Sequence, residues 1–153
     1  MCITDADACF LDPDYGTKIE KVVNDYGHIY GLIGCLTNRL GGSHQCYKGH
    51  FNEDMNTMNH RAIPLELWEK NGTRVDETTG VAGVFMLFNK DTWKKAGGFR
   101  EGIITTDTHF NKSIKRLRLK IGLAKGIYIF HNYRLSEHGQ GQKKAQQSIK
   151  HLS

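Results

Sequence analysis

Short apolar runs divide the chain into segments. We expect four of these runs to form strands, at residues 1–4, 28–40, 80–90 and 123–133. The first is short, β-prone and followed by acids, as a buried strand that ends at a functional loop would be. The run at 80–90 is almost continuously apolar, which is typical of a central strand covered on both faces. The pattern predicts a sheet whose strands are separated by longer segments.

Helical spacing marks three of those segments, at 12–27, 60–71 and 106–122. In the first, Asp12 is the expected N-cap, Pro13 the first helical residue and Gly27 the residue just past the end. In the last, Gly122 is expected to end the helix. The two predicted apolar stripes are Ile19, Val22, Val23 and Tyr26, and Phe110, Ile114, Leu117 and Ile121.

A polar loop at 41–56 and a short helical segment at 90–96 complete the pattern, the latter stopped by Gly97 and Gly98. Strands alternate with helices, so the predicted class is α/β. Without an internal repeat or a linker, we expect one domain over residues 1–135 and a polar, basic tail over 136–153.

The composition and charge of the chain bear on its cellular compartment and on its partners. The 153 residues are 39% hydrophobic and 24% charged, which fits one globular domain. No run approaches the ~20 apolar residues of a membrane helix, and there is no signal-peptide pattern, so a cytoplasmic protein is expected. The net charge of +5 fits solvated faces, or attraction to phosphate on a nucleotide or at a membrane surface. Basic and aromatic residues do not interleave, so no nucleic-acid partner is expected.

The four cysteines are too few and too irregular for a secreted disulfide framework, and we expect free thiols. A zinc site formed by Cys46, His50 and His60 is a minor alternative, because the chain has no C-x-x-C pair.

Two carboxylates, Asp5 and Asp7, follow the first predicted strand directly. Carboxylate oxygens are hard ligands for Mg²⁺ or Mn²⁺, and such ions commonly take substrate phosphates as further ligands. By itself the D-x-D pattern also fits a turn cap.

Further segments make the pattern more specific. "TDADACF", then "GVAGVFMLFNKDTWKKAGGFREGIITTDTHF", then "IYIFHNYR" resemble the catalytic half of a family 2 glycosyltransferase. The resemblance implies a partial GT-A fold, a nucleotide-diphospho-sugar transferase-like mixed sheet flanked by helices. It also implies a nucleotide-sugar donor, UDP- or GDP-linked, and a glycan, lipid or protein acceptor.

The resemblance assigns roles to individual residues. Asp7, Asp5 and His131 would hold Mn²⁺ or Mg²⁺ beside the donor diphosphate, with Asp5 alternatively on the ribose. Asp107 would be the general base in an inverting transfer to a hydroxyl. A glycine pair and an aromatic residue would shape the sugar and acceptor pocket, namely Gly97, Gly98 and Phe99.

Each role has a structural alternative. Asp107 also fits a helix N-cap, a role that Thr105 or Thr106 could share. The family often has two consecutive acids at the place where this chain has Thr106 and Asp107. His131 also fits a buried core histidine. Gly97 and Gly98 also fit a helix stop, and Phe99 a core position.

The family pattern has further βαβ units before the D-x-D strand, where this sequence has four residues. We therefore expect a fragment, a half that pairs with another chain, or an inactive remnant, and a partner or self-association covering the sheet edge. The alternatives to a transferase are a truncated binding module and a haloacid-dehalogenase-like phosphatase. In the latter, Asp5 would be the nucleophile and Asp7 the general acid.

Overall fold

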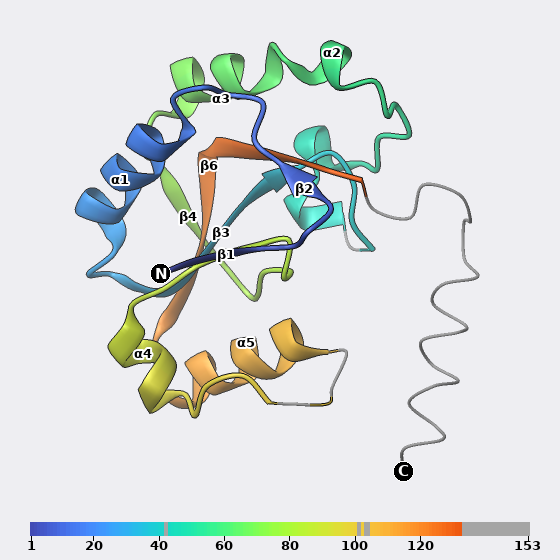
Figure 1. Cartoon of the computed structure of the whole chain (residues 1–153). Coiled ribbons are helices and arrows are strands. Elements are labelled where there is room, and N and C mark those ends of the chain that lie inside the picture. The colour runs from blue at the N-terminus through green and yellow to red at the C-terminus, as the bar shows by residue number, and fades with distance from the viewer. Residues whose placement is uncertain (42, 101, 103–104, 133–153) are drawn as a thin grey trace.

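The computed structural model describes residues 1–41, 43–100, 102 and 105–132, and within them the chain forms one mixed sheet flanked by helices (Figure 1). Its strands lie in the order β1-β5-β3-β6-β2, and β4 also pairs with β6. They are β1 (Cys2–Thr4), β2 (Ala8–Cys9), β3 (Tyr30–Thr37), β4 (Val75–Thr78), β5 (Phe85–Leu87) and β6 (Lys120–His131). The predicted α/β class with a mixed sheet is confirmed.

Three of the strands point the same way. β5 is antiparallel to both β1 and β3, while β3 and β6 pair in parallel. The chain therefore leaves β1, β3 and β6 at the same edge of the sheet. In open α/β sheets this edge is the common place for ligands.

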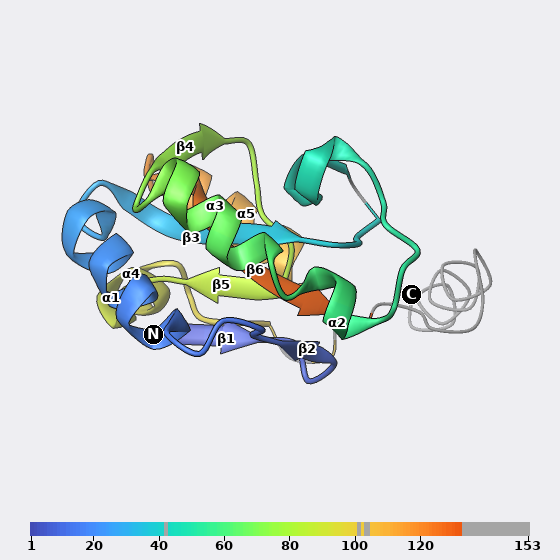
Figure 2. The same cartoon turned by 90° about the horizontal axis from the view of Figure 1, so that it is seen from above.

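Helices cover both faces of the sheet (Figures 1 and 2). α1 (Tyr15–Tyr26) and α3 (Ile63–Asn71) lie on one face, and α4 (Lys90–Lys95) and α5 (Thr106–Arg116) lie on the other. The segment between β3 and α3 contains two 3₁₀ turns and one short helix: η1 (Ser43–Gln45), η2 (Tyr47–Gly49) and α2 (Thr57–His60).

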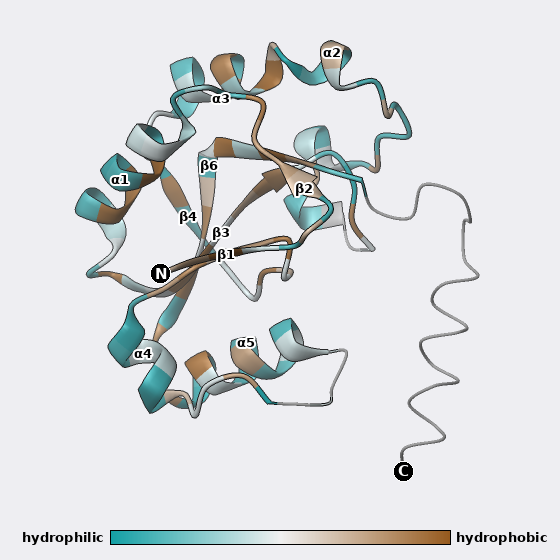
Figure 3. Cartoon of the chain, in the orientation of Figure 1, coloured by the Kyte–Doolittle hydropathy of each residue, from teal (hydrophilic) through white to brown (hydrophobic). Residues whose placement is uncertain are grey.

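The strand side chains alternate between the two helical layers, as the two-residue period of a strand requires. In β5, Phe85 and Leu87 pack on the side of α1, whereas Met86 joins Phe110 and Ile114 of α5. Figure 3 shows apolar residues, in brown, along much of the strands and on parts of the flanking helices. Full burial of one such side chain contributes about 1.5–3 kcal/mol relative to exposure. The strand predicted over 80–90 is shorter in the structure, where β5 covers only Phe85–Leu87, but its predicted position inside the sheet, between β1 and β3, is confirmed.

The first predicted helix starts later than expected. α1 begins at Tyr15, with Asp14 at the N-cap position and no side-chain cap. Asp12 is only 5% exposed and does not cap the helix; its Oδ1 accepts from the Asp14 amide at 2.9 Å, and it pairs with Lys18. The Asp12 and Pro13 predictions were wrong because this acid orders a turn ahead of the helix.

The last predicted helix is too long by several residues. α5 ends at Arg116, whereas Ile121 and Gly122 belong to β6. Arg118 adopts a left-handed φ of 57°, and the amide of Leu119 bonds to the Ile114 carbonyl at 3.2 Å. This is a Schellman ending without its usual glycine, which is why no stop signal was visible in the sequence.

β2, β4 and α2 were not predicted. The two residues of β2 pair with the end of β6, and β4 pairs with its beginning. β4 reads Val-Asp-Glu-Thr, with only Val75 buried, so it has no apolar run to mark it. Such edge strands form because β6 offers a partner, not because of their own sequence.

β1 lies at the opposite edge of the described sheet, with exposed Cys2 and Thr4. A partner or a second copy covering this edge stays a prediction. The tail predicted over 136–153 lies outside the described residues. In the part of the chain that the structure describes, no helix has the length and apolar character needed to cross a bilayer.

Candidate metal centre

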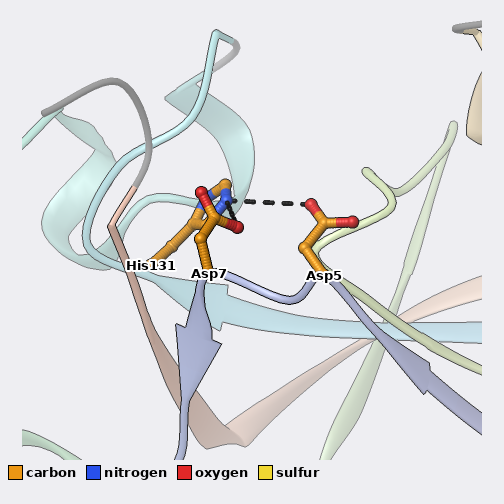
Figure 4. A group of neighbouring side chains, drawn as sticks. All are labelled: Asp5, Asp7 and His131. Atoms are coloured by element: carbon orange, nitrogen blue, oxygen red, sulfur yellow. Dashed lines mark ion pairs between the residues drawn. The ribbon is translucent and has the colours of Figure 1, made fainter.

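Two acids and a histidine meet where β1 and β6 end (Figure 4). Asp5 follows β1, Asp7 lies in the turn into β2, and His131 is the last residue of β6. Nε2 of His131 is 3.2 Å from Oδ1 of Asp7 and 3.7 Å from Oδ2 of Asp5. One ligand atom from each residue lies within 4.8 Å of the others. The structure therefore brings together residues 126 positions apart, as the sequence analysis anticipated.

The backbone fixes which nitrogen of His131 faces the acids. Nδ1 lies 3.1 Å from the carbonyl oxygen of Arg39. A carbonyl oxygen only accepts, so Nδ1 carries the hydrogen and Nε2 is the nitrogen that faces Asp5 and Asp7. Without its proton, Nε2 offers its lone pair to an ion placed between the two acids. This is the arrangement in which histidine ligates a metal, with its second nitrogen oriented by a backbone carbonyl.

Asn38 holds the backbone of His131 on both sides. Its Oδ1 accepts from the His131 amide at 2.7 Å, and its Nδ2 donates to the His131 carbonyl at 3.1 Å. Asp7 is tied to the same strand end, since its carbonyl accepts from the Asn132 amide at 2.9 Å. Hydrogen bonds from the residues just after β3 and β6 thus hold the backbone of His131 and Asp7 in place.

The site is closed on the histidine side and open on the acid side. His131 is 3% exposed, whereas Asp5 and Asp7 are 49% and 51% exposed. Burial raises the pKa of Asp5; the His131 ring opposes the rise, and the carboxylates of Asp7 and Asp107 add to it. A cation between these groups would relieve the repulsion and remain accessible to a substrate.

Asp107 lies beside this cluster, at the start of α5. Its Oδ2 accepts from the Gly83 amide at 3.1 Å, and its Oδ1 accepts from the Thr108 amide at 2.6 Å. A β-carbon added at Gly83 would lie 3.6 Å from Cβ of Asp107 and 3.8 Å from Oδ1 of Asp5. Gly83 thus separates the two carboxylates, and the absence of a side chain leaves open space between them.

Side-chain oxygens hold the loop before β5 at three successive amides. The Val81 amide donates to Asn111 at 2.9 Å, the Ala82 amide donates to Gln45 at 2.6 Å, and the third is the Gly83–Asp107 bond above. Asn111 and Gln45 are both buried. They position the loop from α5 and η1, and the sequence analysis did not identify them, Gly83 or Asn38.

The residues predicted to shape the sugar and acceptor pocket are Gly97, Gly98 and Phe99, at the end of α4 and just after it. Gly97 and Gly98 have φ of 86° and 70° and end α4, and they line a hollow of about 430 Å³ with basic residues. Phe99 packs against Phe88 and Phe110, with ring centroids 5.8 and 4.9 Å away. The alternatives of a helix stop and a core aromatic therefore describe these positions, although the glycines also border a hollow.

The zinc alternative has no support in the described residues. Nδ1 of His60 lies 2.7 Å from the Tyr128 hydroxyl, and its Nε2 lies 2.9 Å from the Asp54 carbonyl. Both ring nitrogens are engaged, so His60 is a core residue. The group with metal-ligand geometry in the described part of the chain is Asp5, Asp7 and His131.

The donor set of that group is compatible with a divalent ion. Carboxylate oxygens suit Mg²⁺ and Mn²⁺, and an imidazole nitrogen also suits ions such as Zn²⁺ and Fe²⁺. Three protein ligands that face solvent leave positions for water or substrate oxygens, as in catalytic and not in structural metal sites.

Comparison of the chain with models of protein families, with curated proteins and with solved structures finds no match. The function is therefore inferred from the chemistry of the site.

Proposed function

We propose that this chain is the catalytic part of a metal-dependent glycosyltransferase, which moves a sugar from a nucleotide donor to a hydroxyl acceptor. The observation that carries the proposal is the convergence of Asp5, Asp7 and His131 around one point, with Asp107 beside them. A metal site of hard ligands next to a separate carboxylate suits a reaction with an anionic leaving group and a proton to remove.

Asp5, Asp7 and His131 would hold Mn²⁺ or Mg²⁺. When bound, the ion supplies Lewis-acid stabilisation of the departing nucleoside diphosphate. The half-exposed carboxylates leave coordination positions for phosphate oxygens. The buried His131 keeps its lone pair aimed at the ion, because its Nδ1 is held by the Arg39 carbonyl.

Asp107 acts as the general base in this proposal. The amides of Gly83 and Thr108 each donate to one of its oxygens, and its charge acts on nearby Asp5 across the open space at Gly83. There it would take the proton of an acceptor hydroxyl as the oxygen attacks the anomeric carbon. A single displacement of this kind inverts the configuration of that carbon.

Metal binding is tested first, because every later step depends on it. Isothermal titration of wild type with Mn²⁺ should show one site, and Asp7→Asn should remove it. Glu69→Gln, an exposed acid on α3, is the matched control and should bind as wild type does. Equal Mn²⁺ binding by Asp7→Asn and wild type would reject the site.

Turnover is tested with a panel of UDP- and GDP-sugars in the presence of Mn²⁺. Release of the nucleoside diphosphate should depend on Asp7. Asp107→Asn should keep Mn²⁺ and donor binding and reduce transfer by about 10²–10⁴-fold, the usual contribution of general base catalysis. Donor binding without release by any member of the panel would favour the binding-module alternative.

A further inference from the structure

Positive charge is concentrated in the layer formed by α4 and α5. Residues 90–120 contain nine lysines and arginines and three acids, a formal charge of +6. This exceeds the net charge of +5 of the whole chain. Residues 1–89 and 121–132 together carry a formal charge of −4, and residues 133–153, which lie outside the described part of the chain, carry +3. Within the described residues, positive charge is therefore concentrated in the α4 and α5 layer.

Several of these cations line two adjacent hollows along α5. The first, about 340 Å³, is bordered by His44, Asp107, Lys112 and Lys115. The second, about 430 Å³, is bordered by Gly97, Gly98, Arg100, His109, Lys112 and Arg116. Because Lys112 borders both, we treat the hollows as one surface and call it the α5 groove.

The charges of the α5 groove are available to a ligand. Lys112, Lys115, Arg100 and Arg116 are exposed, and within the described residues no ion pair joins any of them to an acid. Arg116 donates to Ser113 at 2.8 Å, which leaves its charge unbalanced. Cations gathered in a hollow attract a compact dianion more strongly than the same cations spread over a flat face.

The α5 groove begins at the proposed base. Asp107 and Lys112 border the same hollow, and Thr108 and Asn111 lie between them on α5. A molecule bound along the groove would place a hydroxyl near Asp107 and an anionic group near Lys112 and Lys115. The metal site is built of acids and takes the diphosphate only through its ion, so the two anion sites do not compete.

We propose that the α5 groove binds a phosphate group on the acceptor substrate; this inference rests on the proposed function. The acceptor hydroxyl oxygen forms the new bond to the anomeric carbon, and its proton passes to Asp107. The bond from that carbon to the diphosphate oxygen breaks, and its electron pair leaves with the nucleoside diphosphate. The acceptor's phosphate is unchanged and serves to orient the hydroxyl.

The site is tested separately from catalysis, by titrating metal-free ¹⁵N-labelled protein with glycerol 1-phosphate at pH 8. At this pH the phosphate is a dianion, since its second pKa is about 6. We expect amide shifts confined to residues 97–98 and 107–116, and binding at least about tenfold weaker in Lys112→Gln. Lys70→Gln on α3, on the other face of the sheet, is the control and should match wild type. Shifts outside the α5 groove, or equal binding by Lys112→Gln, would overturn the site.

Three further comparisons fix the source and role of the phosphate. Asp7→Asn should bind glycerol 1-phosphate as wild type does, so loss of the metal site leaves this readout intact.

A response to phosphatidic acid vesicles without one to glycerol 1-phosphate would place the phosphate on a lipid. If wild type transfers sugar and Lys112→Gln keeps the same KM for a phosphorylated acceptor, the acceptor role is rejected. If wild type transfers nothing, the proposed function and the acceptor role fail, while the titration still decides the site.

Discussion

At the scale of single residues, the candidate metal centre depends on groups outside the proposed ligand set. His131 presents Nε2 because the Arg39 carbonyl and Asn38 hold its ring and backbone. Asn38 is 1% exposed and bonds to both the amide and the carbonyl of His131. A small displacement of β6 here would move Nε2 of His131 directly, so the proposed metal site depends on these bonds.

Asn38→Ala should weaken both the fold and the metal site. The two His131 backbone groups would lose their partners, a cost of about 1–3 kcal/mol in the free energy of unfolding. Affinity for Mn²⁺ should fall about 10–100-fold, as for other losses of groups that orient a ligand. Urea denaturation and isothermal titration measure the two effects. Asn24→Ala, at an exposed position on α1, is the control; unchanged Mn²⁺ affinity in Asn38→Ala would contradict the positioning role.

Asp5→Asn should stabilise the metal-free protein while abolishing tight Mn²⁺ binding. Burial raises the pKa of Asp5 above its ordinary value of 3.8, so the ionised form costs stability in the folded state. The penalty is fully present above the raised pKa and disappears once the pH is well below the ordinary value, where Asp5 is protonated in both the folded and the unfolded state. The melting temperature of the variant should therefore exceed that of wild type at pH 7, and the difference should shrink as the pH falls through the raised pKa and vanish well below the ordinary value of 3.8. A gain that does not change with pH would show that the carboxylate charge is not its cause.

The sequence marks Asp5 and Asp7 by their place directly after an apolar run, whereas His131 and Asp107 were assigned through the family resemblance. In the structure Asp5 follows β1 and His131 ends β6, and parallel strands bring such ends together. Asn38 and Asn111 gave no such signal, because their roles consist of hydrogen bonds to backbone distant in the sequence. Nothing local distinguishes a buried asparagine from an exposed one.

At the scale of elements, α4 and α5 end in the same way with different residues. Each closes with a Schellman pattern: the Gly98 amide bonds to the Trp93 carbonyl at 2.9 Å, and the Leu119 amide bonds to the Ile114 carbonyl at 3.2 Å. The left-handed position is Gly97 in α4 and Arg118 in α5, with φ of 86° and 57°. Only glycine adopts this conformation without a steric cost.

Arg118→Gly should therefore stabilise the protein. Relief of the left-handed strain is worth about 1 kcal/mol, which corresponds to a rise of about 2–4 °C in melting temperature for a chain of this size. Arg118→Ala is the matched control, since it removes the same charge but keeps the β-carbon. A gain of equal size in both variants would assign the effect to charge instead of backbone conformation.

The two helix ends also show which helices and strands could be predicted from the sequence. The end of α4 was correctly predicted from Gly97, while α5 was extended through Ile121 because Arg118 gives no stop signal. β3 and β5 were recognised from their buried apolar runs, whereas β4 and β2 exist through pairing with β6. Local pattern predicts the central strands, and the edges of the sheet follow from tertiary structure.

At the scale of the whole molecule, β6 connects most of the structure to the site. It pairs with β3, β4 and β2 and ends at His131. The acids come from the turn between β1 and β2, at the other end of the described chain. An ion held by Asp5, Asp7 and His131 would therefore join the first residues of the fold to its last strand.

Mn²⁺ should consequently stabilise the fold globally, since the site exists only when β1, β2 and β6 are assembled. At a free Mn²⁺ concentration 100 times the dissociation constant, linkage predicts about 2.7 kcal/mol of added stability. Amide hydrogen exchange should slow in β2 and the end of β6, where pairing is shortest, and also in β3, which has no ligand of its own. Exchange measured with Mn²⁺ and after EDTA tests this, with Asp7→Asn as the reference. Protection confined to the Asp5–Asp7 turn, or equal protection in Asp7→Asn, would mean that the ion binds to exposed acids without joining the two ends of the fold.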